Sequence, residues 1–144
     1  MKGMNKELVI EAAALQIMIN SATRAFPEEC CGFFWGLEEE KRTTLALEVR
    51  NVAEDKHVSF SISQQDYRLA ENIAEEHQLT LLGVFHSHPR QSSLPSIEDI
   101  ELAFPNLYYI IMGVNSNEVY EMSCWLLNES KSFDNVLIIT NNNS

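Results

Sequence analysis

Two histidines one residue apart are the feature of this sequence best suited to chemistry. His86 and His88 follow an apolar run, residues 79–85, that is typical of a strand covered on both faces. Side chains at positions i and i+2 of a strand point to the same side, so both imidazoles can meet one metal ion. Zinc in catalytic sites takes three ligands from His, Asp and Glu side chains and keeps a fourth position open. A third ligand is then required.

Asp99 is the best placed candidate for that third ligand. It lies eleven residues after His88, in the first turn of a helix predicted over residues 96–104, and the loop before this helix allows the chain to double back. Ser96 and Asp99 are three residues apart, so both can lie on the same side of the helix start and face the histidines. The complete spacing is H-x-H-x10-D.

Both halves of this pattern also have an interpretation without a metal. Ser-x-x-Asp at a helix start is typical of a capping box, and a histidine pair at a strand end can be a satisfied, buried pair. A cap requires no histidines upstream, however, and a buried pair requires no acid downstream. The combination of the two halves favours a metal site.

Other classes of metal enzyme fit this chain less well. Cupin-type sites need a later histidine, and none follows His88. Metallo-β-lactamase-like sites need H-x-H-x-D-H, whereas the letters P-R-Q follow the second histidine here. Zinc-dependent deaminases need H-x-E with P-C-x-x-C, and no C-x-x-C occurs. The remaining histidines, His57 and His77, are expected on the surface.

The rest of the chain predicts an α/β fold, a mixed β-sheet flanked by about three helices. One helix ends before Pro27, a second begins after a cap at Ser63, and the third covers residues 96–104. We expect one domain, residues 1–140, and a frayed polar tail, residues 141–144. Strands are predicted over residues 8–10, 31–37, 43–52, 58–62, 79–85, 107–114, 119–127 and 136–140.

Composition narrows the class of partner. The 144 residues carry a formal net charge of -11, which would repel phosphate backbones, so neither nucleic acid nor an anionic membrane surface is expected as the main partner. No signal peptide or membrane span is apparent, which indicates a soluble cytoplasmic protein. The three cysteines form no disulfide or zinc-knuckle pattern and are expected to fill the core.

The pattern H-S-H-P-x6-S-x2-D, formed by His86, His88, Ser96 and Asp99, closely resembles the JAMM motif of the JAB/MPN metallopeptidases. Upstream, the letters P-E-E-C-C-G resemble the E-x-C-G segment of the same family, with Glu29 in register. The neighbouring glutamate should point away, because successive strand residues face opposite sides. The resemblance extends along most of the chain and is greatest to the compact prokaryotic members.

The resemblance implies a cytidine-deaminase-like JAB/MPN fold in which His86, His88 and Asp99 hold Zn²⁺. It implies that Glu29 is the general base and that Ser96 donates a hydrogen bond to the developing oxyanion. The implied reaction is hydrolysis of a peptide or isopeptide bond at the Gly-Gly tail of a ubiquitin-like or sulfur-carrier protein. The alternative is a catalytically inactive MPN-like scaffold that binds a ubiquitin-like partner, although such scaffolds usually lack a metal ligand. The substrate protein and the oligomeric state stay open.

Overall fold

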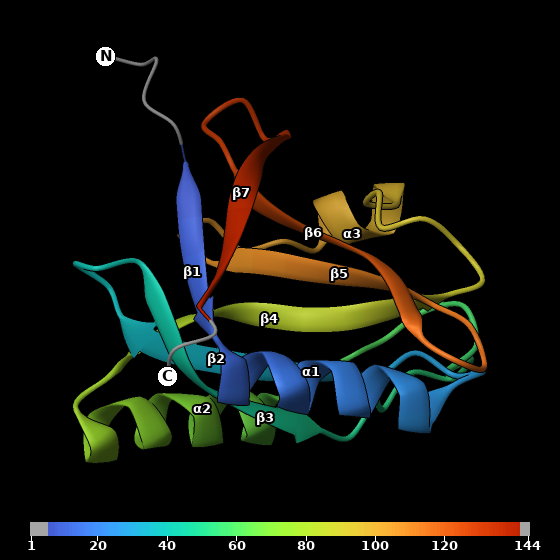
Figure 1. Ribbon diagram of the computed structural model, residues 1–144, viewed down its shortest axis with the longest axis horizontal. Coiled ribbons are helices and arrows are strands. Elements are labelled where there is room, and N and C mark those ends of the chain that lie inside the picture. Colours follow the sequence, from blue (N-terminus) through green and yellow to red (C-terminus); the bar gives the residue numbers. More distant parts are fainter. Residues whose placement is uncertain (1–5, 142–144) are drawn as a thin grey trace.

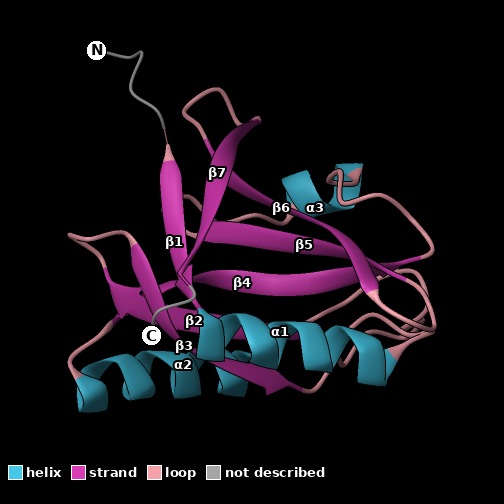
Figure 2. Cartoon of the chain, in the orientation of Figure 1, coloured by secondary structure: helices cyan, strands magenta, loops and turns pink. Residues whose placement is uncertain are grey.

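The computed structural model describes residues 6–141. Within this range the chain forms seven strands and three helices (Figure 1, Figure 2). The helices are α1 (Ala12–Ala25), α2 (Gln64–His77) and α3 (Ile97–Glu101). The strands are β1 (Glu7–Glu11), β2 (Cys31–Leu37), β3 (Arg42–Val49), β4 (Thr80–Pro89), β5 (Tyr108–Val114), β6 (Val119–Leu127) and β7 (Phe133–Asn141).

The strands form one closed barrel in the order β1-β3-β2-β4-β5-β6-β7. β1 closes the barrel because it pairs in parallel with both β3 and β7. β4 and β5 are also parallel, whereas the other neighbours are antiparallel. The predicted mixed sheet with three helices is confirmed for the described residues, but closure of the sheet was not predicted. The cytidine-deaminase-like comparison stays a prediction.

The two faces of β2 build two hydrophobic cores. Phe34 packs in the core that includes Met18 of α1, whereas Phe33 and Trp35 pack in the core that includes Ala70 of α2. The indole nitrogen of Trp35 also donates a hydrogen bond of 2.8 Å to the Ala70 carbonyl. Each large side chain buried in this way contributes about 1.5 to 3 kcal/mol. In Figure 1 both long helices lie below β4, and α3 lies above β5.

Local signals set the helix ends. α1 ends before Pro27, as predicted, because proline cannot donate within a helix. α2 begins after Ser63, whose hydroxyl accepts a hydrogen bond of 3.1 Å from the Asp66 amide, which confirms the predicted cap. α3 is shorter than predicted and ends at Glu101. The sequence therefore predicts both elements that carry the proposed ligands, β4 with the two histidines and α3 with Asp99, although their lengths differ from the prediction.

The predicted strand over residues 58–62 is wrong, because no strand of the barrel covers this segment. Its backbone instead bonds to the region just after β3: Val52 N donates to Ser61 O at 2.9 Å, and the side chain of Asn51 bonds to Ser59 and Ser61. The alternating pattern does not specify a partner strand, and the segment instead begins in a turn whose Val58 and Ser59 amides donate to the Asp55 carbonyl. Asn141, which the sequence places in the tail, ends β7, and residues 142–144 lie outside the described residues.

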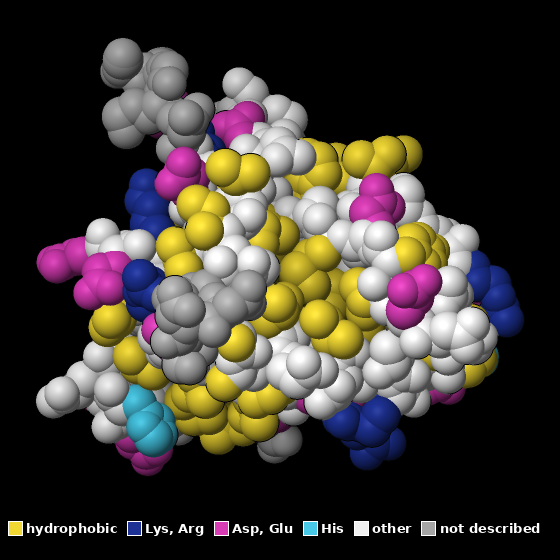
Figure 3. Space-filling model, viewed as in Figure 1, with side chains coloured by type: hydrophobic (Ala, Val, Ile, Leu, Met, Phe, Trp, Pro, Cys, Tyr) yellow, Lys and Arg dark blue, Asp and Glu magenta, His cyan; other side chains and the backbone are white. Residues whose placement is uncertain are grey.

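An apolar groove lies between α1 and the last two strands. Its lining includes Leu15 and Ile19 of α1, Met122 of β6 and Ile138 of β7. Figure 3 shows hydrophobic side chains gathered across the middle of this face and charged side chains around its edge. The groove shares no lining residue with the cavity beside the histidines that is described below. Among the helices of residues 6–141, none combines the length and apolar composition needed to cross a bilayer.

Candidate metal centre

The pairing of β2 with β4 places the predicted ligands on one face. Cys31 lies opposite His86, and two residues further along β2 Phe33 lies opposite Val84. Since Phe33 and Val84 belong to the core beneath α2, His86 and His88 emerge on that same face by alternation. Both imidazoles are buried. The predicted orientation of the histidine pair therefore agrees with the structure.

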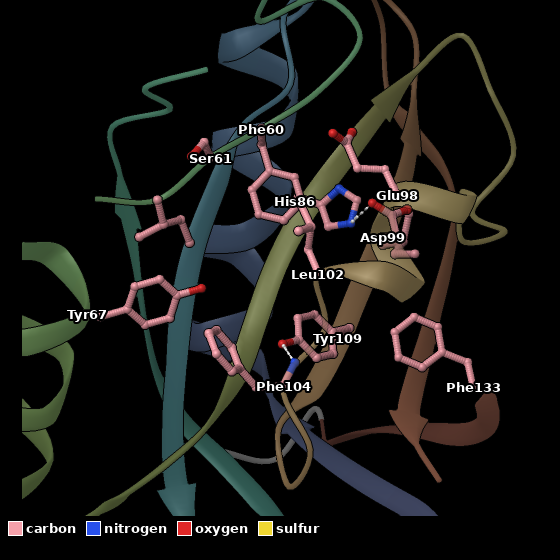
Figure 4. A pocket seen from close by; sticks show the side chains of 12 residues that line it. Phe60, Ser61, Tyr67, His86, Glu98, Asp99, Leu102, Phe104, Tyr109 and Phe133 are labelled. Carbon is pink, nitrogen blue, oxygen red and sulfur yellow. Dashed lines mark hydrogen bonds and ion pairs between the residues drawn. The ribbon is translucent and has the colours of Figure 1, made fainter. Parts of the chain in front are cut away.

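Asp99 of α3 lies directly against both imidazoles. Its Oδ1 is 3.5 Å from His86 Nε2, and its Oδ2 is 3.2 Å from His88 Nε2. The three potential ligand atoms lie within 4.8 Å of one another. Figure 4 shows the His86 ring between Phe60 and Asp99. α3 lies in the connection between the parallel strands β4 and β5, which is how an acid from a later segment reaches the end of β4.

Ser96 and Asp99 form the capping box that was the alternative interpretation of this segment. Ser96 Oγ accepts from the Asp99 amide at 3.0 Å, and Asp99 Oδ2 accepts from the Ser96 amide at 2.8 Å. The same carboxylate meets the histidines, so the cap and the proposed site coexist. The Ser96 hydroxyl uses only its acceptor capacity in this cap, which leaves its O–H free to donate to another group.

The second histidine is held by the loop that follows it. His88 Nδ1 lies 3.0 Å from the Ser92 carbonyl oxygen. A carbonyl can only accept, so Nδ1 carries the hydrogen and Nε2 is the nitrogen left to face Asp99. A hydrogen bond of this kind at the other ring nitrogen is what orients histidine ligands in metal sites.

The charges at this site are strongly coupled. Burial lowers the pKa of His88, but its hydrogen bonds to Asp99 and to the Ser92 carbonyl, together with nearby negative charge, outweigh burial and raise the pKa above its ordinary value. Burial raises the pKa of Asp99, whereas the hydrogen bond to His88 and the charge of His86 prevail and lower it from 3.8 to about 2. Asp99 is therefore ionised at neutral pH, and a metal cation would compete with the proton on His88.

Glu29 lies beside this cluster, as the resemblance implied. The residue is buried, and its Oε1 is 3.7 Å from His86 Nδ1. That nitrogen is itself buried and has no hydrogen-bond partner, which is unusual for a polar atom in a protein interior. The face of the His86 ring is covered by Phe60, with ring centroids 4.2 Å apart and planes inclined by 25°.

The donor set fits a catalytic zinc ion. Two imidazole nitrogens and one carboxylate oxygen are a common ligand set for such sites, and three protein ligands leave one position for water or substrate. Glu29 lies close to this donor set, with its Oε1 3.7 Å from His86 Nδ1. The other histidines are exposed, as predicted: His57 lies 3.5 Å from Asp55 at the surface, and His77 ends α2.

The cysteines are buried free thiols, as predicted. Burial raises the pKa of Cys30 to about 12, and burial also raises the pKa values of Cys31 and Cys124. Since the thiolate is the reactive form of cysteine, these buried thiols are expected to be unreactive and to fill the core.

A match to a family sequence model identifies the family to which this chain belongs. The model described as prokaryotic homologs of the JAB domain matches residues 11–128 of the chain. The chain belongs to this family. The matched range contains Glu29, both histidines of β4, Ser96 and Asp99.

Two relatives of this JAB domain have named activities. It is 30% identical to a desampylase of Pyrococcus furiosus over 113 residues, which cover 77% of this chain and 75% of the relative. It is 25% identical to the CysO-cysteine peptidase of Mycobacterium tuberculosis over 122 residues, which cover 84% of this chain and 83% of the relative.

Solved structures support the JAB/MPN fold. A protein from Desulfitobacterium hafniense has a TM-score of 0.81 at 25% identity, over 94% of this chain and 93% of that chain. A JAB1/MPN domain protein from Archaeoglobus fulgidus has a TM-score of 0.56 at 18% identity, over 92% of this chain and 99% of that chain. The JAB domain described above is therefore a JAB/MPN fold with three helices around a closed barrel.

A cavity of about 200 Å³ opens beside His86 and Asp99 of the JAB domain (Figure 4). Most of its walls are aromatic or aliphatic. The Tyr109 hydroxyl in this wall accepts a hydrogen bond of 2.7 Å from the Phe104 amide, and burial raises the pKa of Tyr109 to about 12. The apolar lining consists of Phe60, Ile62, Tyr67, Leu102, Phe104, Tyr109, Ile111 and Phe133.

Sequence reasoning missed the side chains that support the ligands. β6 holds the loop before α3, because the Glu121 carboxylate accepts from the Ser93 amide at 2.8 Å and the Ser123 hydroxyl donates to the Ser93 carbonyl. These bonds fix the loop that presents the Ser92 carbonyl to His88. The sequence pattern predicts a strand at Phe60, and no pattern marks Asn51. None of these residues stands at a spacing that marks a site.

Proposed function

We propose that this JAB domain is a zinc-dependent hydrolase that cleaves a peptide or isopeptide bond at the Gly-Gly tail of a ubiquitin-like or sulfur-carrier protein. The strongest support is the convergence of two imidazole nitrogens and one carboxylate beside a buried glutamate. His86, His88 and Asp99 would hold the metal. The activities named for the two relatives, desampylase and CysO-cysteine peptidase, support a carrier-protein tail as the substrate.

Each residue then has a distinct task. A divalent cation bound at this site supplies Lewis acidity and makes a neighbouring water more acidic at neutral pH. Glu29 accepts a proton from the attacking water and later donates it to the leaving amine, a role worth about 10² to 10⁴-fold in rate. The free O–H of Ser96 donates to the oxygen that becomes negative at the scissile carbonyl, and loss of one such donor costs about 10² to 10³-fold.

The apolar cavity supports binding of an extended tail next to these residues. Its walls begin at His86 and Asp99, so a side chain of the tail close to the scissile bond can be buried there. The Gly-Gly residues themselves lack side chains, which allows the backbone to approach the buried ligands closely.

The direct test uses carrier proteins extended beyond Gly-Gly. Three probes are incubated with the purified chain: a linear peptide extension, an isopeptide-linked lysine peptide and a single cysteine adduct. Mass spectrometry of the products is expected to show a loss of mass to the Gly-Gly end for at least one probe. The loss should disappear with a chelator and return when zinc is added.

The same experiment separates the enzyme from a catalytically inactive scaffold. The zinc content of the chain is measured alongside each reaction. Fully loaded protein that binds the carrier but leaves all three probes uncut would refute hydrolysis and favour the scaffold. Cleavage that persists at full strength with zinc removed would refute the metal-dependent mechanism.

A further inference from the structure

Asn51, which the proposed mechanism does not use, lies at the centre of the hydrogen bonds around the base. The residue follows β3 and is buried. Its Nδ2 donates to the carbonyl oxygens of Glu29 at 3.0 Å and Ser59 at 3.1 Å. Its Oδ1 accepts from the amides of Ala53 at 3.0 Å and Ser61 at 3.1 Å. A primary amide has two N–H donors and two acceptor sites, so its capacity is filled.

The first consequence concerns the backbone of the base. The Glu29 carbonyl is bound by Asn51, and the Glu29 amide donates to the Lys56 carbonyl at 2.7 Å. The next amide, that of Cys30, donates to Ser87 Oγ at 2.8 Å. Bonds from the segment 51–61 therefore fix the peptide groups on either side of the Glu29 side chain, just before β2 begins.

The second consequence concerns the aromatic ring that covers the first histidine. Phe60 lies between Ser59 and Ser61, and Asn51 bonds to the backbone of both neighbours. The Phe60 ring stacks on His86 and also lines the apolar cavity. One amide side chain thus joins the base, the covered imidazole and part of the cavity wall.

We infer that Asn51 is a positioning residue that holds Glu29 and the Phe60–His86 stack in a single arrangement. This inference rests on the proposed function, because Glu29 is a base only if the chain hydrolyses a substrate. Asn51 acts through Glu29, because its four hydrogen bonds go to Glu29, Ala53, Ser59 and Ser61 and none goes to a proposed ligand. A displacement of about 1 Å at a reacting group can cost on the order of 100-fold in rate, so a lost bond at the Glu29 carbonyl should be visible in turnover.

The test variant is Asn51→Asp, which preserves the size of the side chain. A carboxylate can still accept from Ala53 and Ser61, but it cannot donate to the carbonyls of Glu29 and Ser59. The matched control is Asn115→Asp in the β5–β6 turn, where Oδ1 only accepts, from the amides of residues 117 and 118. The control therefore makes the same chemical change without loss of a donor bond.

Asn51→Asp is expected to lower kcat on the cleaved carrier probe by on the order of 10- to 100-fold while the zinc content per chain stays equal to that of the parent. Asn115→Asp should leave both unchanged. In a Glu29→Gln background, measured by single turnover, Asn51→Asp should cause little further loss, because residues that act as a unit are not additive. An equal fold-loss in both backgrounds would overturn the inference, since it would indicate a general structural effect.

A second measurement does not depend on activity. In Asn51→Ala, hydrogen exchange at the amides of Glu29, Ala53 and Ser61 should become faster, while exchange in β4 and β5 stays unchanged. If this variant does not fold, Asn51→Asp is measured at the Glu29 amide instead. Unchanged protection at Glu29 would overturn the inference. If the chain binds zinc but cleaves no probe, the proposed function is refuted, whereas the positioning role of Asn51 is not. Hydrogen exchange at the Glu29 amide then tests that role by itself.

Discussion

Asp99→Asn, measured with zinc removed by a chelator, tests the electrostatics of the site directly. The fall in the Asp99 pKa from 3.8 to about 2 means that the folded state favours the ionised carboxylate. At about 1.4 kcal/mol per pKa unit, this corresponds to roughly 2 kcal/mol of stability. The raised pKa of His88 reflects the same pair, so the two shifts are not added. We expect Asp99→Asn to lose about 2 kcal/mol in urea unfolding near pH 5 to 6.

The pH dependence of the chelated parent follows from the signs of the two shifts. The contribution of Asp99 to the free energy of unfolding is fully present above the pKa of the unfolded state and is lost as pH falls from about 4 toward 2. The contribution of His88 is complete below pH 6.5 and is lost as pH rises through its raised folded pKa. Stability from this pair should therefore be greatest between about pH 4.5 and 6.5. The control is Glu98→Gln, which removes one negative charge from an exposed side chain in the same helix turn.

Two results would refute this reasoning. Asp99→Asn could unfold at the same urea concentration as the parent between pH 5 and 6, which would mean that the carboxylate gains nothing from the histidines. Alternatively, Glu98→Gln could cost as much as Asp99→Asn, which would assign the effect to the helix N-terminus rather than to the pair.

Four further substitutions test single residues. Glu29→Gln should retain zinc by metal analysis but lose about 10² to 10⁴-fold in kcat. His88→Ala should lose both the zinc and the activity. A kcat of Glu29→Gln equal to that of the parent would show that Glu29 is not the base. Ser96→Ala should lower kcat by about 10² to 10³-fold and unfolding free energy by about 1 kcal/mol, and loss of stability alone would leave Ser96 as a cap only. Gly83→Ala should lower the free energy of unfolding in urea by more than about 3 kcal/mol, because the added Cβ would lie 2.1 Å from the Tyr108 carbonyl oxygen. A urea midpoint equal to that of the parent would show that β4 and β5 can move apart to make room for it.

The parts of the site that the sequence predicted correctly depend on local geometry. His86 and His88 share a face because strand side chains alternate, and Ser96 with Asp99 share a helix start because of the helical spacing. The buried run before the histidines identified β4, whereas its register with β2 is known only from the structure. Local periodicity therefore accounts for each of the two pairs, whereas the contact of Asp99 with the histidines depends on the fold and the place of Glu29 on the family resemblance.

The parts that could not be predicted depend on pairing between distant segments. β1 closes the barrel by pairing with β7 from the other end of the chain, and neither segment carries a pattern that selects the other. Segment 58–62 begins in a turn and forms no strand, and its backbone bonds to the side chain of one buried asparagine instead of a neighbouring strand. Asn51 carries no charge and belongs to no motif, so only its four bonds in the folded chain give it a role.

The Asp99 carboxylate both caps α3 and faces the two histidines. Binding of a cation by this carboxylate would therefore also affect the stability of α3. A helix of five residues has almost no stability of its own in water. The first turn of α3 depends on Asp99, and the residues just after it, Leu102 and Phe104, form one wall of the cavity. Any ligand that binds only the folded arrangement stabilises it by mass action. Under the proposed function, removal of the cation should therefore loosen the cavity wall formed by Leu102 and Phe104 and weaken binding of a carrier tail.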